Sequence, residues 1–170
     1  MKRTFAAILS AAALGLAMTQ LADAQTQRPR EGKARDGKMK GLIDQGRYLV
    51  QIAGCNDCHT PGYMEAGGKI DEKLWLTGDR LAWRGPWGTT YAINLRLYMQ
   101  KLTEVQWLDN ARTMKPRPPM PWFNIQVMSD RDLRALYYYI KSLSPAGEPA
   151  PAYLPPDQEP PQGPTVRFSG

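Results

Sequence analysis

Apolar residues recur at helical spacing in three parts of the chain. In 129–143 they follow an i, i+3, i+4, i+7 pattern after Ser129-Asp130, a pair that typically caps a helix. Thr103-Glu104-Val105-Gln106 has the form of a capping box and predicts a helix that continues to about Met114. An amphipathic pattern over 41–53 predicts a further helix. These patterns indicate a helical protein.

Glycine and proline break the periodicity between and after these helices. From Thr60 to Arg96, glycines alternate with tryptophans, which predicts a long irregular loop packed by large side chains. Residues 115–121 hold four prolines and cannot be helical, because proline lacks the backbone donor. Residues 145–170 hold eight prolines and predict a polyproline-like tail, either disordered or laid along the body as an extended strap.

Residues 1–24 have the features of a secretory signal peptide. Lys2 and Arg3 form the charged start, 5–18 is rich in alanine and leucine, and Ala22-Asp23-Ala24 has small residues at both positions that a signal peptidase reads. We expect cleavage before Gln25 and a periplasmic location. The apolar run is shorter than the roughly 20 residues that span a bilayer, so we do not expect stable membrane insertion after cleavage.

The net charge is +6 for the full chain and +5 without residues 1–24, and most of it lies near the start of the mature chain. Residues 28–40 hold six basic and two acidic side chains, and we interpret 25–40 as a basic flexible leader before one folded domain over 41–144. A nucleic-acid partner is not expected, because an exported protein seldom meets nucleic acid. The chain also lacks a basic stripe interleaved with aromatic residues at helical spacing.

Cys55-Asn56-Asp57-Cys58-His59 contains both cysteines and the single histidine of the chain. This is the spacing of a c-type haem attachment site, in which each thiol forms a thioether with one vinyl group and the imidazole becomes the proximal iron ligand. A thioredoxin-like pair needs a βαβ context, and a zinc site usually needs a fourth ligand; the sequence supplies neither. We therefore expect one covalent haem c held by Cys55, Cys58 and His59.

The sixth iron ligand decides between electron transfer and small-molecule chemistry. The chain has no second histidine, so methionine is the expected ligand. Pro118-Pro119-Met120-Pro121 restricts the backbone around Met120 to an extended conformation, and a rigid loop presents a thioether at little entropic cost. Met120 is the favoured distal ligand, with Met128 and Met114 as alternatives. Composition alone suggests three residues as partners of the haem propionates: Trp83, Arg84 and Trp87.

From Gly41 to about Ala146, these residues resemble the class I cytochrome c fold. A helix containing Gly46 leads into the attachment motif, and a Met-Pro segment precedes the final helix. The resemblance implies an all-α, cytochrome c-like domain around one haem, in which the first and last helices cross. It also implies that Gly46 allows close approach of the aromatic face at 137–139.

Three segments are more closely similar to the cytochrome c subunits of periplasmic quinoprotein and flavoprotein dehydrogenases: Met120-Pro121-Trp122, Ser129-Asp130 and Leu143-Ser144-Pro145. The chain departs from those subunits after Leu95, and it has one haem motif where they often have several. We expect an electron carrier, not an enzyme, that exchanges single electrons with a dehydrogenase, an oxidase or another cytochrome. The alternatives are a haem protein whose open or displaceable distal site binds gas or peroxide, and a permanent haem subunit of a larger dehydrogenase.

Overall fold

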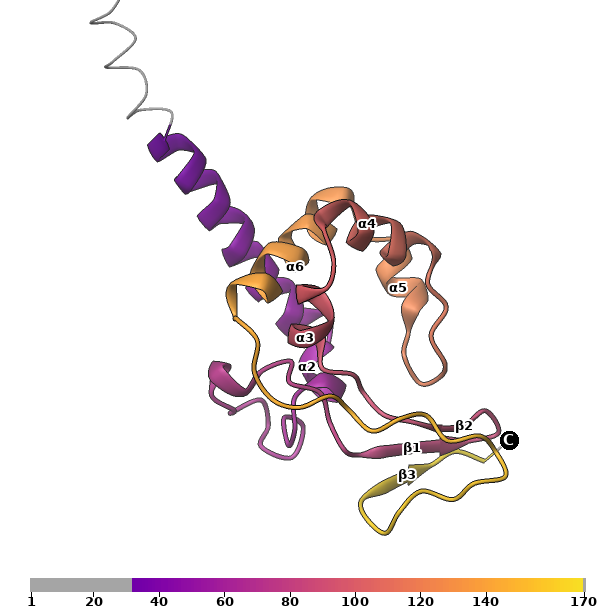
Figure 1. Cartoon of the computed structure of the whole chain (residues 1–170). Coiled ribbons are helices and arrows are strands. Elements are labelled where there is room, and N and C mark those ends of the chain that lie inside the picture. Colours follow the sequence, from indigo (N-terminus) through magenta and orange to yellow (C-terminus); the bar gives the residue numbers. More distant parts are fainter. Residues whose placement is uncertain (1–31, 170) are drawn as a thin grey trace, which may run out of the picture. The chain divides into compact units, whose positions relative to one another are not determined.

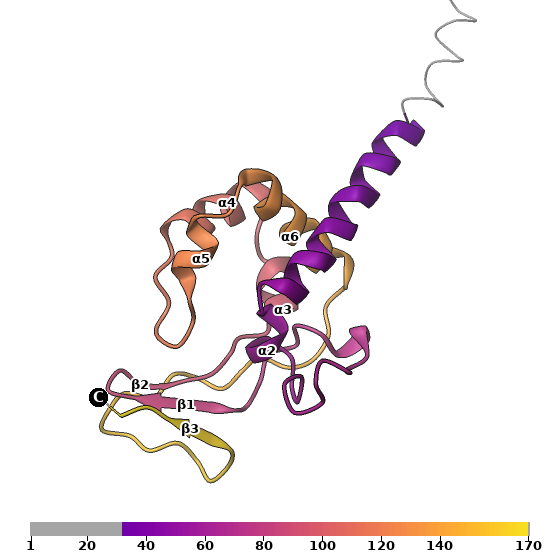
Figure 2. The same ribbon diagram turned by 180° about the vertical axis from the view of Figure 1, so that it is seen from behind.

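The computed structural model describes residues 32–169, and the residues from Leu42 onward form one compact unit. A helix over residues 32–52 comes first. The later elements, labelled in Figures 1 and 2, are α2 (Cys55–His59), η1 (Glu72–Leu74), β1 (Ala82–Gly85), β2 (Gly88–Thr90), α3 (Leu95–Gln100), α4 (Glu104–Thr113), α5 (Trp122–Gln126), α6 (Asp130–Ser142) and β3 (Thr165–Arg167). None of the helices in the described part of the chain has the length and apolar character needed to cross a membrane.

The predicted flexible leader differs from the structure. The sequence predicts a basic flexible leader over 25–40, whereas residues 32–40 are part of the helix over 32–52. Residues 32–40 contain no proline, and their lysines, arginine, alanine and methionine favour helix and outweigh Gly32 and Gly37. All of 32–40 is exposed. The predicted signal peptide and residues 25–31 lie outside the described residues.

Local capping signals locate α4 and α6. Thr103 and Gln106 form the reciprocal capping box of α4, in which the Thr103 N–H donates to the Gln106 side chain at 2.9 Å. The Ser129 hydroxyl accepts a backbone N–H in the first turn of α6 at 3.2 Å. The sequence pattern does not predict α3, which begins where the Asn94 side chain accepts the Leu97 N–H at 3.0 Å.

The first and last helices of the domain meet at Gly46, as the family resemblance implies. A β-carbon on Gly46 would lie 2.5 Å from Tyr139 Cβ and 2.6 Å from the carbonyl carbon of Ala135, so only glycine allows this approach. α6 also packs against α3 and α4. The hydrophobic core therefore surrounds α6, whose Leu133 and Leu136 are buried.

A small sheet departs from the predicted all-α fold. β1 pairs antiparallel with β2, with Trp83 opposite Thr90, and parallel with β3, with Trp83 opposite Val166; the strand order is β2-β1-β3. The prediction of an irregular loop over 60–96 is therefore wrong for the hairpin at 82–90. Strands of three or four residues are too short for an alternating pattern to identify them. The fold is mostly helical with one three-stranded sheet.

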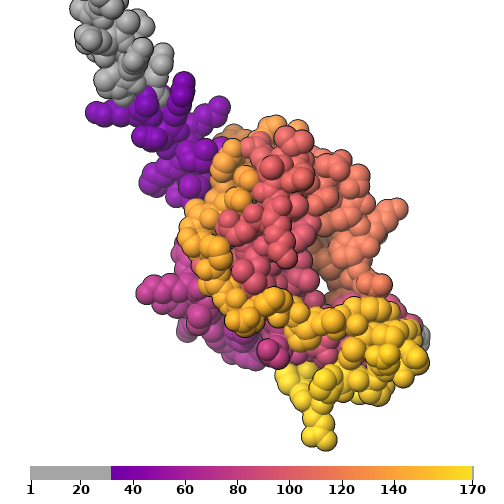
Figure 3. Space-filling model, viewed as in Figure 1, coloured from indigo at the N-terminus to yellow at the C-terminus, as the bar shows by residue number. Residues whose placement is uncertain are grey.

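We call residues 145–168 the strap. The strap is extended and packed against the domain rather than disordered, and it ends in β3. Its Leu154 exchanges two backbone hydrogen bonds with Thr89, at 2.8 and 3.0 Å. Near its end, Phe168 contacts Trp83 and Trp87, with ring centroids 6.2 and 5.3 Å apart. Figure 3 shows the strap in orange and yellow along one face, bordering a hollow beside the salmon segment that precedes α5.

Candidate functional site

The predicted attachment residues lie together on α2. Cys55 and Cys58 are three positions apart and share one face of this helix, and His59 follows in its last turn. Gly54 precedes α2 with a φ of 68°, a left-handed conformation that glycine adopts readily and that turns the chain out of the preceding helix. One short helix therefore presents the whole motif.

Buried hydrogen bonds fix α2 in place. The Thr60 hydroxyl donates to the Asn56 side chain at 2.8 Å and accepts the Leu76 N–H at 2.8 Å. All three residues are buried, so each bond is protected from competing water. Thr60 thus links Asn56, the second residue of the motif, to the backbone of Leu76.

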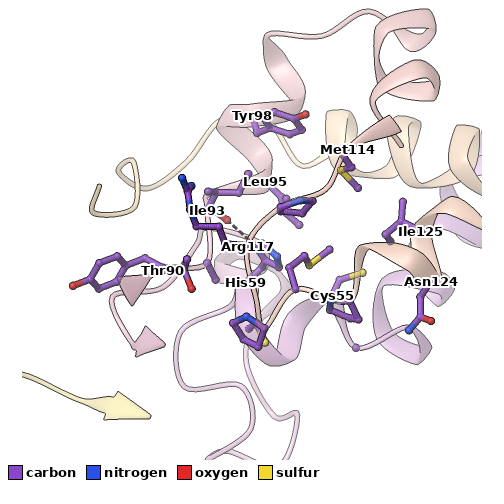
Figure 4. A pocket seen from close by; sticks show the side chains of 18 of the residues that line it. Cys55, His59, Thr90, Ile93, Leu95, Tyr98, Met114, Arg117, Asn124 and Ile125 are labelled. Carbon is purple, nitrogen blue, oxygen red and sulfur yellow. Dashed lines mark hydrogen bonds between the residues drawn. The ribbon is translucent and has the colours of Figure 1, made fainter. Parts of the chain in front are cut away.

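His59 is buried, with 7% of its surface exposed. Its Nδ1 lies 2.8 Å from the Ile93 carbonyl oxygen, so Nδ1 carries the proton and donates it, along the dashed line in Figure 4. Burial lowers the pKa of His59, and the bond to Ile93 offsets this only in part. The ring is therefore neutral and its Nε2 keeps a lone pair. A neutral imidazole oriented by a hydrogen bond at its other nitrogen is the form that ligates a metal.

The surroundings of both motif cysteines disfavour a thiolate. Burial raises the pKa of Cys55 to about 11, and it also raises the pKa of Cys58. Reactive disulfide-exchange cysteines have lowered pKa values instead. Among the described residues, no group of three or more histidine, cysteine, aspartate or glutamate side chains is placed to hold a metal ion. The raised thiol pKa values disfavour a thioredoxin-like pair, and the lack of a ligand cluster among the described residues disfavours a zinc site.

A cavity of about 610 Å³ lies beside α2. Cys55, Cys58 and His59 line it together with residues of α3, α5, α6 and the strap, and Figure 4 shows several of these side chains around it. Its volume falls within the roughly 300–1,000 Å³ of typical cofactor pockets. The walls are mostly apolar, and of the described residues only Lys115 and Arg117 bring a charged Lys, Arg, Asp or Glu side chain to them. A largely apolar, dianionic haem fits such a cavity.

Met120 lines this cavity, as do the alternatives Met114 and Met128. The structure thus brings all three predicted methionines to the cavity that His59 lines. Two other methionines are exposed, Met39 at 39% and Met64 at 49%. The backbone before Met120 differs from the extended prediction, because it turns at 118–119. The fixed φ of proline is compatible with turns as well as with extended chain.

The three residues suggested as propionate partners are separated by the structure. Trp83 lines the cavity, whereas Arg84 and Trp87 do not. Arg84 instead bonds the strap, with one guanidinium nitrogen 2.6 Å from the Pro156 carbonyl oxygen. Sequence reasoning missed the Ile93 carbonyl, which orients His59, because a backbone acceptor 34 residues away leaves no side-chain signal.

Residues 43–144 match the cytochrome c family, which is more than half of the chain. The chain belongs to this family, whose members are typically electron carriers, and it carries one haem c attached through the Cys-x-x-Cys-His motif at Cys55 and Cys58. Comparisons with curated proteins and with solved structures gave no match.

Proposed function

We propose that this cytochrome c carries single electrons outside the cytoplasm, with His59 and Met120 as the two axial ligands of its iron. The observation that best supports this is that a neutral, oriented His59 and methionine thioethers line the same apolar cavity as the attachment cysteines. The haem, when bound, supplies the one-electron chemistry. A histidine–methionine pair suits that task, because both side chains ligate ferric and ferrous iron and the thioether raises the reduction potential.

Met120 is favoured among the cavity methionines because its loop is held on both sides. The Met120 carbonyl accepts the Trp122 N–H at 2.9 Å, and the Pro118 carbonyl accepts the Thr90 hydroxyl at 2.8 Å. The prolines on either side of Met120 also line the cavity. A backbone that is already ordered loses little entropy when its side chain ligates a metal. The other cavity methionines belong to or adjoin helices: Met99 lies within α3, Met114 caps α4, and Met128 follows α5. None of them has prolines on both sides.

The cavity chemistry favours a carrier over a peroxide-reactive protein. Peroxide chemistry needs a positioned acid–base group on the distal side. The only histidine of the chain has its Nδ1 bonded to Ile93, and none of the described aspartate or glutamate side chains lines the cavity. The proposed partner is a redox protein, and the similarity of three segments to dehydrogenase cytochrome subunits supports a dehydrogenase as that partner.

Redox titration of the exported, haem-loaded full chain tests this function. We expect a reversible one-electron titration, with a tenfold change in the ratio of oxidised to reduced protein for every ~59 mV. The ferrous protein should not bind carbon monoxide promptly at neutral pH, because a methionine occupies the distal position. Prompt and complete binding of carbon monoxide would show an open distal site and favour the gas-reactive alternative.

Export is tested by the mass of the mature protein. The proposed cleavage predicts a chain that starts at Gln25, carries the added mass of one haem and is recovered from the periplasmic fraction. A protein that retains Met1, or that stays with the membrane after a salt wash, would contradict the proposed location. This result leaves the ligand assignment unaffected.

A further inference from the structure

The strap is anchored to β1 by a nearly buried arginine. The Arg84 side chain is 12% exposed, and its guanidinium donates to the carbonyls of Pro156 at 2.6 Å, Gln158 at 2.9 Å and Pro155 at 3.3 Å. It also pairs with Glu159 at 3.1 Å. A guanidinium presents five N–H donors in a fixed plane, so it can hold several consecutive carbonyls at once. The prolines of the strap have no backbone N–H, so Arg84 supplies donors that hold this part of the strap in place.

From this anchor the strap reaches the haem cavity. Pro151 and Tyr153 both line the cavity, although they lie outside the part of the chain that matches the family. Tyr153 is held on two sides: its hydroxyl donates to the Trp87 carbonyl at 2.9 Å, and the neighbouring Leu154 pairs with Thr89. Its ring is therefore fixed at the cavity wall.

The same ring contacts the loop that carries Met120. The Arg117 guanidinium carbon lies 3.7 Å from the Tyr153 ring centroid, well within cation–π range. Arg117 lies three residues before Met120 and lines the cavity itself. Thr90, the last residue of β2, donates its hydroxyl to the Pro118 carbonyl. One contact from the strap and one from β2 thus hold adjacent residues of this loop.

We propose that the strap is a positioning element of the haem site, in which Tyr153, held in place by the Arg84 anchor, keeps the 115–121 loop at the cavity wall. The inference rests on the proposed function where it concerns Met120 as ligand, whereas the contact between strap and loop stands independently of ligation. Release of the strap lets the loop open, which weakens the methionine–iron bond and admits outside ligands to the distal position.

The test uses the full haem-loaded chain with three strap-directed variants and one control. Arg84→Ala removes the anchor, Tyr153→Ala removes the ring, and Tyr153→Phe keeps the ring but loses the hydroxyl bond. Arg134→Ala is the control, because it removes a surface ion pair between Arg134 on α6 and Glu104 on α4, neither of which belongs to the strap. Hydrogen exchange of a peptide covering 114–124 reports loop opening, exchange in α6 reports overall stability, and imidazole binding to the ferric protein reports distal access.

Arg84→Ala and Tyr153→Ala should speed exchange in 114–124 about tenfold, with exchange in α6 unchanged, and should raise imidazole affinity by a similar factor. Tyr153→Phe keeps the ring, the Leu154–Thr89 pairing and the Arg84 anchor, so it should stay within about twofold of the parent protein on both measures, as should Arg134→Ala. Unchanged loop exchange in Arg84→Ala or in Tyr153→Ala overturns the proposal. A parent protein that lacks a methionine–iron band contradicts the ligand assignment alone, because loop exchange still decides whether the strap positions the loop.

Discussion

Replacing Gly46 by alanine tests the packing on which the domain depends. The added methyl carbon would lie 2.5 Å from Tyr139 Cβ and 2.6 Å from the carbonyl carbon of Ala135. Carbon atoms in contact are normally about 3.5–4.0 Å apart, so the two helices must separate by about 1 Å. Neither neighbouring atom can rotate away, because one is backbone and the other is a β-carbon. Overpacking of this kind costs about 3 kcal/mol.

Helix propensity acts in the opposite direction, because alanine in a helix interior is favoured over glycine by about 1 kcal/mol. We therefore expect Gly46→Ala to lower the free energy of unfolding by about 2 kcal/mol. The assay is urea unfolding of the haem-loaded protein followed by far-ultraviolet circular dichroism. Gly41→Ala is the matched control: this glycine is in the same helix and has nothing within 4 Å of its would-be β-carbon. The free energy of unfolding of Gly41→Ala should rise by about 1 kcal/mol. Equal stability of the two variants would refute the packing argument.

Two further predictions concern polar groups that hold the domain together. Arg96 is buried and donates to the carbonyls of Ser144 at 2.6 Å and Lys73 at 2.8 Å. Arg96→Met should therefore lower the free energy of unfolding by about 3 kcal/mol in the same urea assay. A loss below about 1 kcal/mol would contradict this role. The Tyr138 hydroxyl bonds Glu104 and, together with Arg134, holds the pKa of Glu104 below its ordinary 4.5. Because the folded-state pKa is lowered, this contribution is fully present above pH 4.5 and is lost as the pH falls through the folded-state value. Glu104→Gln should therefore reduce the loss of stability between pH 5 and pH 3, and an unchanged acid profile in thermal unfolding would oppose this account.

Local interactions made much of this structure predictable. The Cys55–His59 motif, the capping box at Thr103 and the N-cap at Ser129 involve residues within five positions of one another, so their chemistry is readable from the sequence alone. The close contact at Gly46 came instead from the family resemblance. The elements defined by neighbouring residues, namely the attachment motif and the helix starts, therefore lie where the sequence predicts them.

Interactions between distant residues account for what the sequence did not predict. The Ile93 carbonyl orients His59 across 34 positions, and Arg84 bonds the strap across more than 70. A carbonyl acceptor is present in every residue, so its use in a particular contact is fixed only by the tertiary fold. The strap similarly becomes ordered through pairing with β1 and β2, since a proline-rich segment cannot form a ladder on its own.

The ferric absorption spectrum of a matched methionine series tests the central claim most directly. Met120→Ala, Met114→Ala and Met128→Ala each remove one thioether from the same cavity. We expect a long-wavelength methionine–iron band in the parent protein that is lost in Met120→Ala alone. The reduction potential of that variant should fall, because the soft ligand that favours ferrous iron is gone. A Met120→Ala protein that keeps both the band and the potential of the parent would show that Met120 is not the iron ligand.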